Sequence, residues 1–463
     1  MRHANLFLLP SVCQANLQST VAAAHVRGQK STVASTPIHP TAVMPLRRLL
    51  DLSATISDRL RRSFSTAAAP SHPPWAIIDY TSMVDRSSSA PGACFHPVAP
   101  PGISHVTAPA HLVSPRARPA PDTNVVQVLF GNVGAASGDG HLLLSYHDLR
   151  AEGPCTTWDL SAPPEIQRFV CNPLTGQMLR LPDIGGSRRT LVFHHMGLLT
   201  QADGWLGRGP PDRFAVAELA FHGAGLERFL SEKGEWETVM GVPCGPPPPR
   251  GMEVNQETVA FGGRLWWVDL TLGAVSVDPF ADRPEIRFVE LPSGSVLPAR
   301  ARSAEEDGDL RKVEDRGLFL REVAKHRRVG VSKGRLRYAE VTPDEPFLLS
   351  SFALDDEGSG WTLQHQVELR QVLADGGYPW QENSAQAAPQ IVVLDPLKAN
   401  AIYLKVGEHV VVVDMHNGKV IGASPLQDEY SLVPCVLPPW LASSTIPTAG
   451  KKDGMESTDD PVN

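Results

Sequence analysis

The stretch Phe261-Gly-Gly-Arg-Leu-Trp-Trp-Val-Asp269 is composed of a glycine turn, a short apolar strand and then an acid. The same order recurs in Val331-Ser-Lys-Gly-Arg-Leu-Arg-Tyr-Ala-Glu340 and in Val406-Gly-Glu-His-Val-Val-Val-Val-Asp414. The glycines at positions 263, 334 and 407 are 71 and 73 residues apart. A repeat of this kind is typical of antiparallel β-sheets that follow one another along the chain.

Two further recurring sequence patterns support this interpretation. A strand is followed by an Asn-Pro or Asp-Pro turn at Asn172-Pro173, Asp278-Pro279 and Asp395-Pro396. A glycine-containing turn also precedes an aromatic residue at Trp236 and again at Trp361. In a set of stacked sheets, a tryptophan on an outer strand packs between neighbouring sheets.

These patterns predict an all-β fold of the β-propeller type with about six blades, and seven as the next choice. About 390 residues follow Trp75, and propeller blades take roughly 40 to 50 residues each. Two unrelated β-sandwiches remain the alternative. The predicted strands are rich in β-branched and aromatic residues and are bounded by Gly, Pro and Asp; they are 125–130, 141–146, 168–171, 213–221, 264–270, 287–291, 334–341, 347–354, 391–394, 401–406 and 409–415.

Composition suggests three segments: an N-terminal extension over 1–66, a β-propeller-like domain over 67–440 and a disordered polar tail over 441–463. Within the domain, we expect loops at the proline-rich stretches 97–121 and 245–250 and at the charged stretch 301–316.

A propeller must lock its terminal blade, because an unpaired edge strand promotes aggregation. We therefore expect the apolar segment Trp75–Tyr80 to pair with a C-terminal strand, with Ala401–Val406 and His409–Met415 as the candidate partners.

The tryptophans give a further expectation. Trp236, Trp266 and Trp361 should be largely buried, because each lies in or beside a strand. Trp266 and Trp267 should face opposite sides of one strand, so that one of them is clearly more exposed. Equal burial of both would indicate a strand covered on both faces.

Residues 44–66 predict an organelle address. Apolar residues alternate there with five arginines in a pattern that forms a basic amphipathic helix, which is typical of import signals. The segment ends in Arg62-Ser-Phe-Ser-Thr66, which resembles a mitochondrial processing site with cleavage near Phe64. A plastid signal and an ordinary surface helix remain alternatives, since Asp51 and Asp58 are unusual in transit peptides, and Met44 is a second candidate start. The five arginines are Arg47, Arg48, Arg59, Arg61 and Arg62.

Charge disfavours broad binding to nucleic acid. The chain has a net charge of −8, and its first 66 residues carry eight basic and two acidic side chains, so the remainder carries −14. An acidic body repels phosphate backbones. The basic run Lys325-His-Arg-Arg328 is a local exception, and we expect it to be a solvated loop. No apolar stretch approaches the eighteen residues of a transmembrane segment, and a soluble protein is expected.

Three motifs suggest chemistry, but each has a simpler interpretation. The glycine-rich segment Gly131–Gly140 resembles a phosphate-binding loop but lacks the Gly-Lys-Ser/Thr of a P-loop, so we expect a hairpin turn. His194 and His195 would point to opposite faces of a strand and not to one metal. Asp355-Asp-Glu357 lacks the alternating acids of a calcium loop, so we expect a solvated turn.

The six cysteines show no zinc or redox spacing, which favours a reducing, intracellular compartment without disulfides. The chain also has no G-x-S-x-G or H-E-x-x-H motif. We therefore assign no catalytic, cofactor-binding or metal-binding residue and expect no cofactor.

Several motifs together resemble a plant family called the domain of unknown function 1618 family, which is expanded in grasses. The resemblance covers most of the chain from Met44 onward. It implies no activity and no catalytic residues, because none is established for that family. The motifs are Arg62-Ser-Phe-Ser-Thr-Ala-Ala-Ala69, Pro73-Pro-Trp-Ala-Ile-Ile-Asp-Tyr80, Ala135-Ala-Ser-Gly-Asp-Gly-His-Leu-Leu-Leu-Ser145, Arg168-Phe-Val-Cys-Asn-Pro-Leu-Thr-Gly176 and Leu265-Trp-Trp-Val-Asp-Leu270.

The leading functional hypothesis is a non-catalytic organellar scaffold that binds an unknown protein or peptide. The alternative is an enzyme, either a hydrolase or a lyase, with its site in the central channel of the propeller. A channel lined by two or more buried ionisable groups would favour the enzyme, whereas a shallow, aromatic-rich face would favour the binder.

Overall fold

A computed structural model describes residues 72–114, 116, 124–152, 165–186, 195–202, 209–220, 225–298, 310–377, 388–426 and 431–448. All of these belong to one compact unit. The predicted import segment 44–66 lies outside the described residues. Among the residues described, no helix combines the length and apolarity that crossing a bilayer requires.

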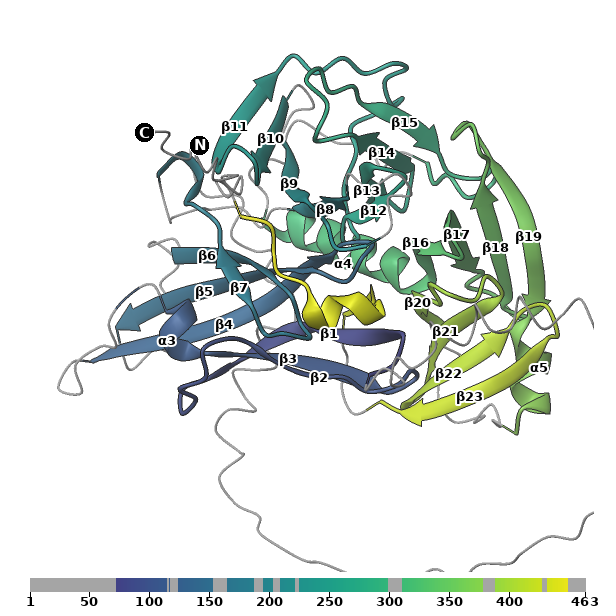
Figure 1. The fold of residues 1–463 in the computed structure, drawn as a ribbon. Coiled ribbons are helices and arrows are strands. Elements are labelled where there is room, and N and C mark those ends of the chain that lie inside the picture. The colour runs from purple at the N-terminus through teal and green to yellow at the C-terminus, as the bar shows by residue number, and fades with distance from the viewer. Residues whose placement is uncertain are drawn as a thin grey trace, which may run out of the picture. The chain divides into compact units, whose positions relative to one another are not determined.

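The described strands form six four-stranded units, which follow one another around a ring (Figure 1). The first strand of each unit contacts the first strands of its neighbours, and the fourth strand of most units lies at the rim (Figure 1). In chain order the units are β4 (Val125–Ala136), β5 (Leu142–Glu152), β6 (Glu165–Cys171) and β7 (Met178–Arg180); β8 (Gly197–Gln201), β9 (Arg213–Ala220), β10 (Gly225–Leu230) and β11 (Glu235–Met240); β12 (Val259–Phe261), β13 (Arg264–Asp269), β14 (Gly273–Val277) and β15 (Arg287–Glu290); β16 (Arg327–Ser332), β17 (Arg335–Val341), β18 (Leu348–Leu354) and β19 (Trp361–Glu368); β20 (Gln390–Leu394), β21 (Ala401–Val406), β22 (His409–Asp414) and β23 (Lys419–Pro425); and finally the closing unit β24 (Leu432–Val436), β1 (Trp75–Asp85), β3 (Ile103–Pro109) and β2 (Cys94–His96).

The closing unit joins the two ends of the domain. β24 pairs antiparallel with β1, from Trp75 opposite Val436 to Asp79 opposite Leu432. Two further residues of β1, Thr81 and Ser82, pair with β4, so the closing unit and β4–β7 share one eight-stranded sheet. The all-β, propeller-like fold is thus confirmed.

The expected N-terminal segment does close the ring, but its predicted partners were wrong. β21 and β22 pair with each other inside their own unit, and the partner of β1 is β24. β24 (Leu432–Val436) has only five residues and contains Pro434, which weakens its strand signal in the sequence.

Hydrophobic packing closes the ring between the first and last parts of the domain, as the pairing of β24 with β1 does. Six buried clusters separate the six units, one at each junction. At the final junction, Trp75, Ile77 and Leu432 of the closing unit pack against Tyr403 and Val410 of β20–β23. Because successive side chains of a strand point to opposite faces, each unit contributes to two clusters, and its strands are covered on both faces.

Trp266 and Trp267 illustrate this double coverage. They do face opposite sides, since Trp266 packs toward β16–β19 and Trp267 toward β8–β11. However, both are buried, with exposed fractions of 6% and 1%, so the expectation that one would be clearly more exposed was wrong. The structure agrees instead with the stated alternative, in which burial of both tryptophans indicates a strand covered on both faces.

Trp236 and Trp361 are only partly buried, contrary to the prediction. Each lies on the outer strand of its unit and donates its indole N–H to a carbonyl of the preceding unit or the loop after it. The Trp236 donor reaches Pro182 O at 2.8 Å, and the Trp361 donor reaches Glu290 O at 2.8 Å. Both tryptophans therefore bridge adjacent sheets, as their turn-plus-aromatic pattern suggested.

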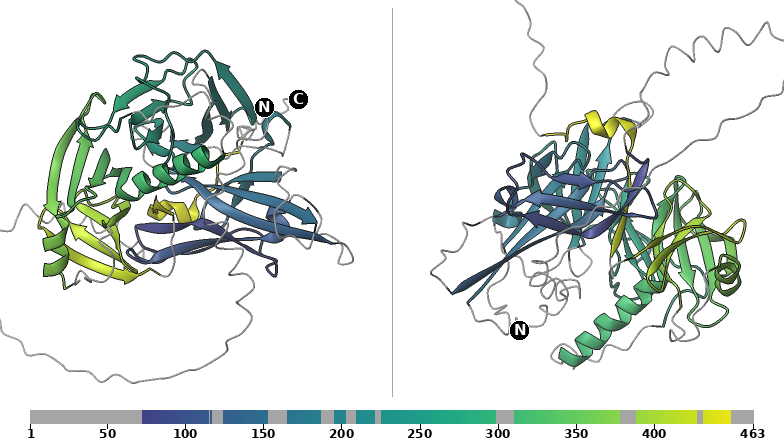
Figure 2. Two further views of the ribbon diagram at one scale, coloured as in Figure 1. Left: turned by 180° about the vertical axis from the view of Figure 1, so that it is seen from behind. Right: turned by 90° about the horizontal axis from the view of Figure 1, so that it is seen from below.

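Two of the predicted loops contain regular structure. The charged stretch 301–316 runs into helix α4 (Leu310–His326), which projects from one side of the ring (Figure 2). The proline-rich stretch 97–121 contains β3 and the short helix α3 (Ala110–Val113). α4 carries many charges and only a narrow apolar face, with Val323 and Ala324 packed against the core, so its periodicity is weak. The other helices in the part of the chain that the structure describes are α5 (Leu369–Asp375), η1 (Ile184–Gly186) and η3 (Pro439–Ser443).

Candidate functional site

A cavity of about 440 Å³, hereafter the mouth cavity, lies where hairpin turns of the ring meet. The turn between β4 and β5, the end of β8, the turn between β12 and β13 and the segment after β24 all contribute to it. Three units and the closing strand thus converge on one space. Its described lining residues are Gly138, Asp139, Leu199, Thr200, Ala202, Gly209, Ala260, Phe261, Gly262, Gly263, Val436, Pro438 and Trp440.

Glycines shape this cavity for local reasons. Gly262 and Gly263 have φ values of 61° and 70°, and they form the two-residue turn of the hairpin in which Phe261 pairs with Arg264. Such turns need positive φ at both positions, which glycine adopts without strain. Gly140 has a φ of 97°, and a Cβ there would lie 2.2 Å from the carbonyl oxygen of Val436. Only glycine lets the β4–β5 turn approach the end of β24 so closely.

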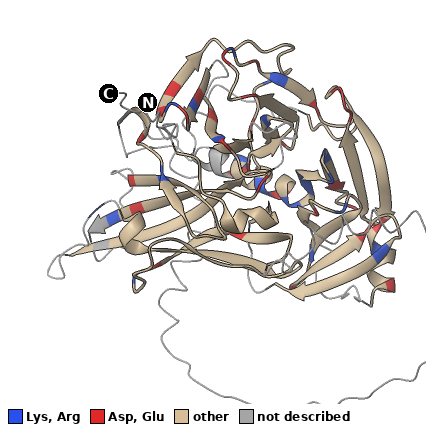
Figure 3. Ribbon diagram, viewed as in Figure 1, with Lys and Arg blue, Asp and Glu red and all other residues tan. Residues whose placement is uncertain are grey.

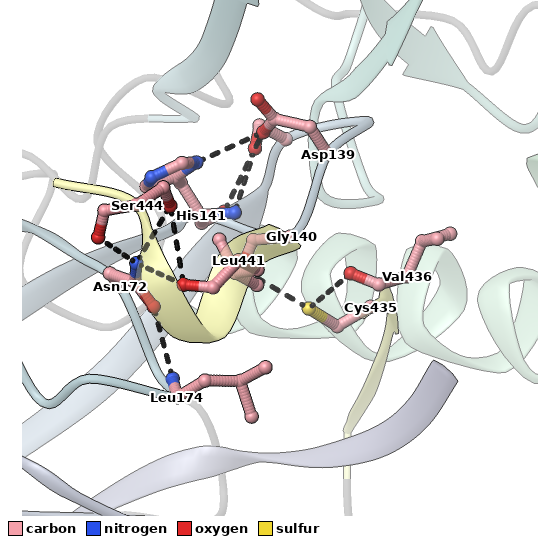
Figure 4. Close-up of polar contacts among 10 residues, drawn as sticks. Asp139, Gly140, His141, Asn172, Leu174, Cys435, Val436, Leu441 and Ser444 are labelled. Carbon is pink, nitrogen blue, oxygen red and sulfur yellow. Dashed lines mark hydrogen bonds and ion pairs between the residues drawn. The ribbon is translucent and has the colours of Figure 1, made fainter. Parts of the chain in front are cut away.

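Asp139 supplies the charge at the cavity (Figure 4). Its Oδ1 accepts a hydrogen bond from Ser137 Oγ and lies 3.1 Å from Nδ1 of His141. Burial alone would raise the pKa of Asp139, but the contacts with His141, Ser137 and Thr200 outweigh burial and lower that pKa below its ordinary value. The carboxylate is therefore ionised near neutral pH.

The Ser137–Asp139–His141 group does not have the geometry of a catalytic triad. In a triad the histidine lies between the serine and the aspartate and accepts the serine proton. Here the aspartate lies in the middle, and Ser137 Oγ also accepts a hydrogen bond from the His141 backbone N–H at 2.9 Å. The group thus stabilises the β4–β5 turn and fixes the carboxylate of Asp139.

Trp440 is positioned by an anchored C-terminal segment. The side-chain amide of Asn172 donates to the carbonyl oxygens of Leu441 and Ser444 at 2.9 and 3.1 Å, and Leu441 and Ile446 are buried (Figure 4). The packed body therefore extends beyond residue 440, where the sequence suggested that a disordered tail begins. Residues from 449 onward lie outside the described part of the chain.

The predicted motifs have the following places. Gly131–Ala136 belongs to β4, and residues 137–141 form the hairpin turn that was expected. His195 is exposed, and its carbonyl oxygen accepts a hydrogen bond from Trp267; its neighbour His194 lies outside the described residues. Asp355 accepts hydrogen bonds from the backbone and hydroxyl of Ser359, as expected of a turn between β18 and β19.

The basic run 325–328 is not a solvated loop, contrary to the prediction. It ends α4 and begins β16, close to the ring axis. Arg327 donates to the carbonyl oxygens of Leu270 and Ser295. Arg328 pairs with Glu257 and donates to Leu432 O at 2.9 Å. These contacts make the run a structural link between units. Elsewhere, acidic and basic residues are interspersed over the strands (Figure 3).

Six four-stranded units closed by a terminal strand, with a cavity where their hairpin turns meet, define a β-propeller protein with a candidate binding mouth. Residues 267–420 match the model of the family described as Protein of unknown function (DUF1618), in agreement with the resemblance that the sequence motifs suggested. The match extends from β13 to β23. It therefore omits every described residue that lines the mouth cavity.

A comparison with curated proteins finds no match. Among solved structures, the chain is similar to apo AztD from Citrobacter koseri, with 12% identity, a TM-score of 0.28 and coverage of 67% of this chain and 88% of that chain. It is also similar to the Cps50 (Swd1) β-propeller domain of Myceliophteria thermophila, with 9% identity, a TM-score of 0.27 and coverage of 62% and 84%. These likenesses carry no inference about function.

The sequence does not mark the residues of the mouth cavity as a group. Asp139 lies in the noted glycine-rich segment and Gly262-Gly263 in the repeat, but nothing in their spacing brings them together. Trp440 lies at the predicted boundary between the β-propeller-like domain and the polar tail. The available signal was Pro438-Pro439-Trp440 directly after a buried strand, which indicates an ordered turn with an anchored aromatic residue.

Proposed function

We propose that this protein is a non-catalytic binding module that takes a positively charged peptide side chain of a partner protein into the mouth cavity. Asp139 would pair with the charge, and Phe261 and Trp440 would contact the aliphatic or guanidinium part. Among the lining residues that the structure describes, Asp139 alone is ionisable. This single observation carries the proposal, because acid–base catalysis generally needs at least two converging proton-transfer groups.

The aromatic lining supports a cationic ligand. Phe261 and Trp440 are partly exposed, and a cation over an aromatic face gains about 0.5 to 2 kcal/mol. Glycines and alanines leave room beside them, and the cavity of about 440 Å³ lies within the usual size range of ligand sites.

Binding of short peptides tests the proposal. Fluorescence anisotropy of N-acetylated peptides with a central lysine or arginine should show binding, whereas the same peptides with acetyl-lysine should bind at least tenfold more weakly. Asp139→Asn should weaken binding about ten- to a hundredfold, since a charge-assisted hydrogen bond contributes about 1.5 to 3 kcal/mol. Binding should stay constant with pH down to the ordinary carboxyl value of 3.8 and fall only below it, because the pKa of Asp139 is lowered.

Asp356→Asn is the matched control. It removes the same charge from an exposed turn, where Asp356 pairs with Arg335 at 3.2 Å, and should leave peptide binding unchanged. Equal effects of the Asp139 and Asp356 variants would contradict the proposal, as would preferential binding of acidic peptides. Trp440→Ala provides a second variant that keeps the charge and removes the aromatic contact.

We also propose that the protein acts in the mitochondrion, on the basis of the basic amphipathic segment 44–66. A fusion of residues 1–75 to a fluorescent protein should enter mitochondria. Replacement of Arg47, Arg48, Arg59, Arg61 and Arg62 by Gln should leave the fusion in the cytosol, because import depends on positive charge. Uniform cytosolic fluorescence of the unmodified fusion would exclude a mitochondrial address. Fluorescence in plastids would indicate a plastid address instead.

A further inference from the structure

Three side chains with metal-ligand chemistry share one face of the closing unit. Cys94 and His96 lie two residues apart on β2, and His96 is paired directly opposite His105 of β3. Phe95, which lies between Cys94 and His96, packs inward opposite the fully buried Val106. Because side chains alternate along a strand, Cys94, His96 and His105 all point to the other face, where Cys94 and His96 are exposed.

The distance between Cys94 and His96 suits a metal ion. Sγ of Cys94 lies 3.5 Å from Nε2 of His96. Tetrahedral zinc with bonds of about 2.3 Å to sulfur and about 2.1 Å to nitrogen separates these two atoms by about 3.6 Å. The two donor atoms are therefore already at the spacing that one ion requires.

His105 has the second contact that metal-binding histidines usually have. Its Nδ1 lies 3.5 Å from Oδ2 of Asp79 on the neighbouring strand β1. Asp79 is itself buried, and its other oxygen accepts the Thr81 backbone N–H at 2.8 Å. A carboxylate that holds one ring nitrogen orients the imidazole and leaves the other nitrogen for the ion. The His105 side chain is 44% exposed, so solvent reaches its ring.

The backbone around these residues is held in place. The N–H of Ala93 donates to Gly176 O at 2.9 Å, just before β2, and the N–H of Val98 donates to Ser104 Oγ at 2.9 Å, just after it. A Cβ at Gly92 would lie 2.2 Å from Gly176 O, which shows how closely the two segments approach. Ligands on such an anchored edge lose little freedom when an ion binds.

We propose that Cys94, His96 and His105 bind a zinc ion, with Asp79 as a positioning residue and the fourth coordination position open. A thiolate and two neutral imidazoles are a donor set that favours Zn²⁺ over Mg²⁺ or Ca²⁺. Binding releases the thiol proton of Cys94 to solvent. Among the described residues no three such groups already surround one point, so binding requires the exposed Cys94 and His96 side chains to turn toward His105 Nε2, while His105 keeps its contact with Asp79. Directly opposed residues on paired strands are close enough for this.

Cobalt titration of the full chain under reducing conditions tests the site, because a Co²⁺–thiolate bond gives a near-ultraviolet charge-transfer band. The band should appear at one equivalent of Co²⁺ and disappear when Zn²⁺ is added. Cys94→Ser should abolish the band. His105→Ala and Asp79→Asn should each lower the Co²⁺ affinity about ten- to a hundredfold.

Cys244→Ser and His111→Ala are the matched controls, since Cys244 is partly exposed and His111 exposed elsewhere on the surface. Both should keep the band and the affinity. The proposal is overturned if the wild-type chain gives no thiolate band, if the band survives Cys94→Ser, or if the controls weaken binding as much as His105→Ala. Cys94 and His105 lie at the surface, so their variants should fold. Thermal melts of all the variants, including that of the buried Asp79, verify folding.

Discussion

Deleting residues 72–82 is expected to prevent the ring from closing and to make the chain aggregate. The deletion removes most of β1, and with it the pairing to β24, β3 and β4. It also removes Trp75, Ile77 and Ile78, which are almost fully buried in the clusters on both faces of β1. Burial of each such side chain contributes about 1.5 to 3 kcal/mol, a large share of the 5 to 15 kcal/mol that stabilises a typical domain. Thermal melts and light scattering would measure the result.

Point variants on the same strand sharpen this prediction. Ile78→Asp places an unpaired carboxylate in a core position and should unfold the domain. Met83→Asp makes the same chemical change five residues later, where the side chain is 56% exposed, and should change the melting temperature little. Deletion of residues 450–463 should also be tolerated. If Ile78→Asp melts like the wild type, β1 does not hold the ring closed.

Replacing Arg328 by methionine is expected to destabilise the domain by about 3 kcal/mol. Arg328 pairs with Glu257 and donates to Leu432 O, so one side chain links β16 to the segment before β12 and to the closing strand. The side chains of Arg328 and Glu257 are only 14% and 18% exposed. Removing the cation leaves the carboxylate poorly solvated, and breaking a buried pair costs about 3 to 5 kcal/mol. Chemical denaturation would measure the change.

The double variant Arg328→Met and Glu257→Gln should recover part of this loss, because it leaves no unpaired charge. Arg335→Met is the control. It breaks the exposed pair with Asp356, whose side chain is 85% exposed, and should cost less than about 1 kcal/mol. If Arg328→Met costs no more than Arg335→Met, Arg328 does not link the units energetically.

The sequence predicted the individual strands well. Each of the eleven predicted strands overlaps an observed strand, including those around Trp266, Tyr338 and Val411. These strands succeed as predictions because their apolar runs are bounded by glycine, proline and aspartate, whose turn preferences are local. The expected closure by Trp75–Tyr80 was also confirmed, although its partner strand was not.

Predictions failed where a residue's neighbours come from another unit. Arg327 and Arg328 are solvent-seeking by type, but β16 places them at the ring axis beside Glu257 and Glu340. Likewise, Trp266 and Trp267 alternate in direction as predicted, yet both are covered, because a sheet packs on each side of their strand. Burial of this kind depends on stacking of units, which local sequence does not encode.

The sequence by itself determined the all-β class, most strands, the acidic body and the basic import-like segment, because turn chemistry, alternation and charge are properties of neighbouring residues. Only the tertiary structure decided which distant residues meet. It placed Asp139 and Trp440 at one cavity, and it paired His96 with His105 beside Cys94. The physical reason is that strand register and the closure of the ring set these contacts, and both result from the packing of all six units together.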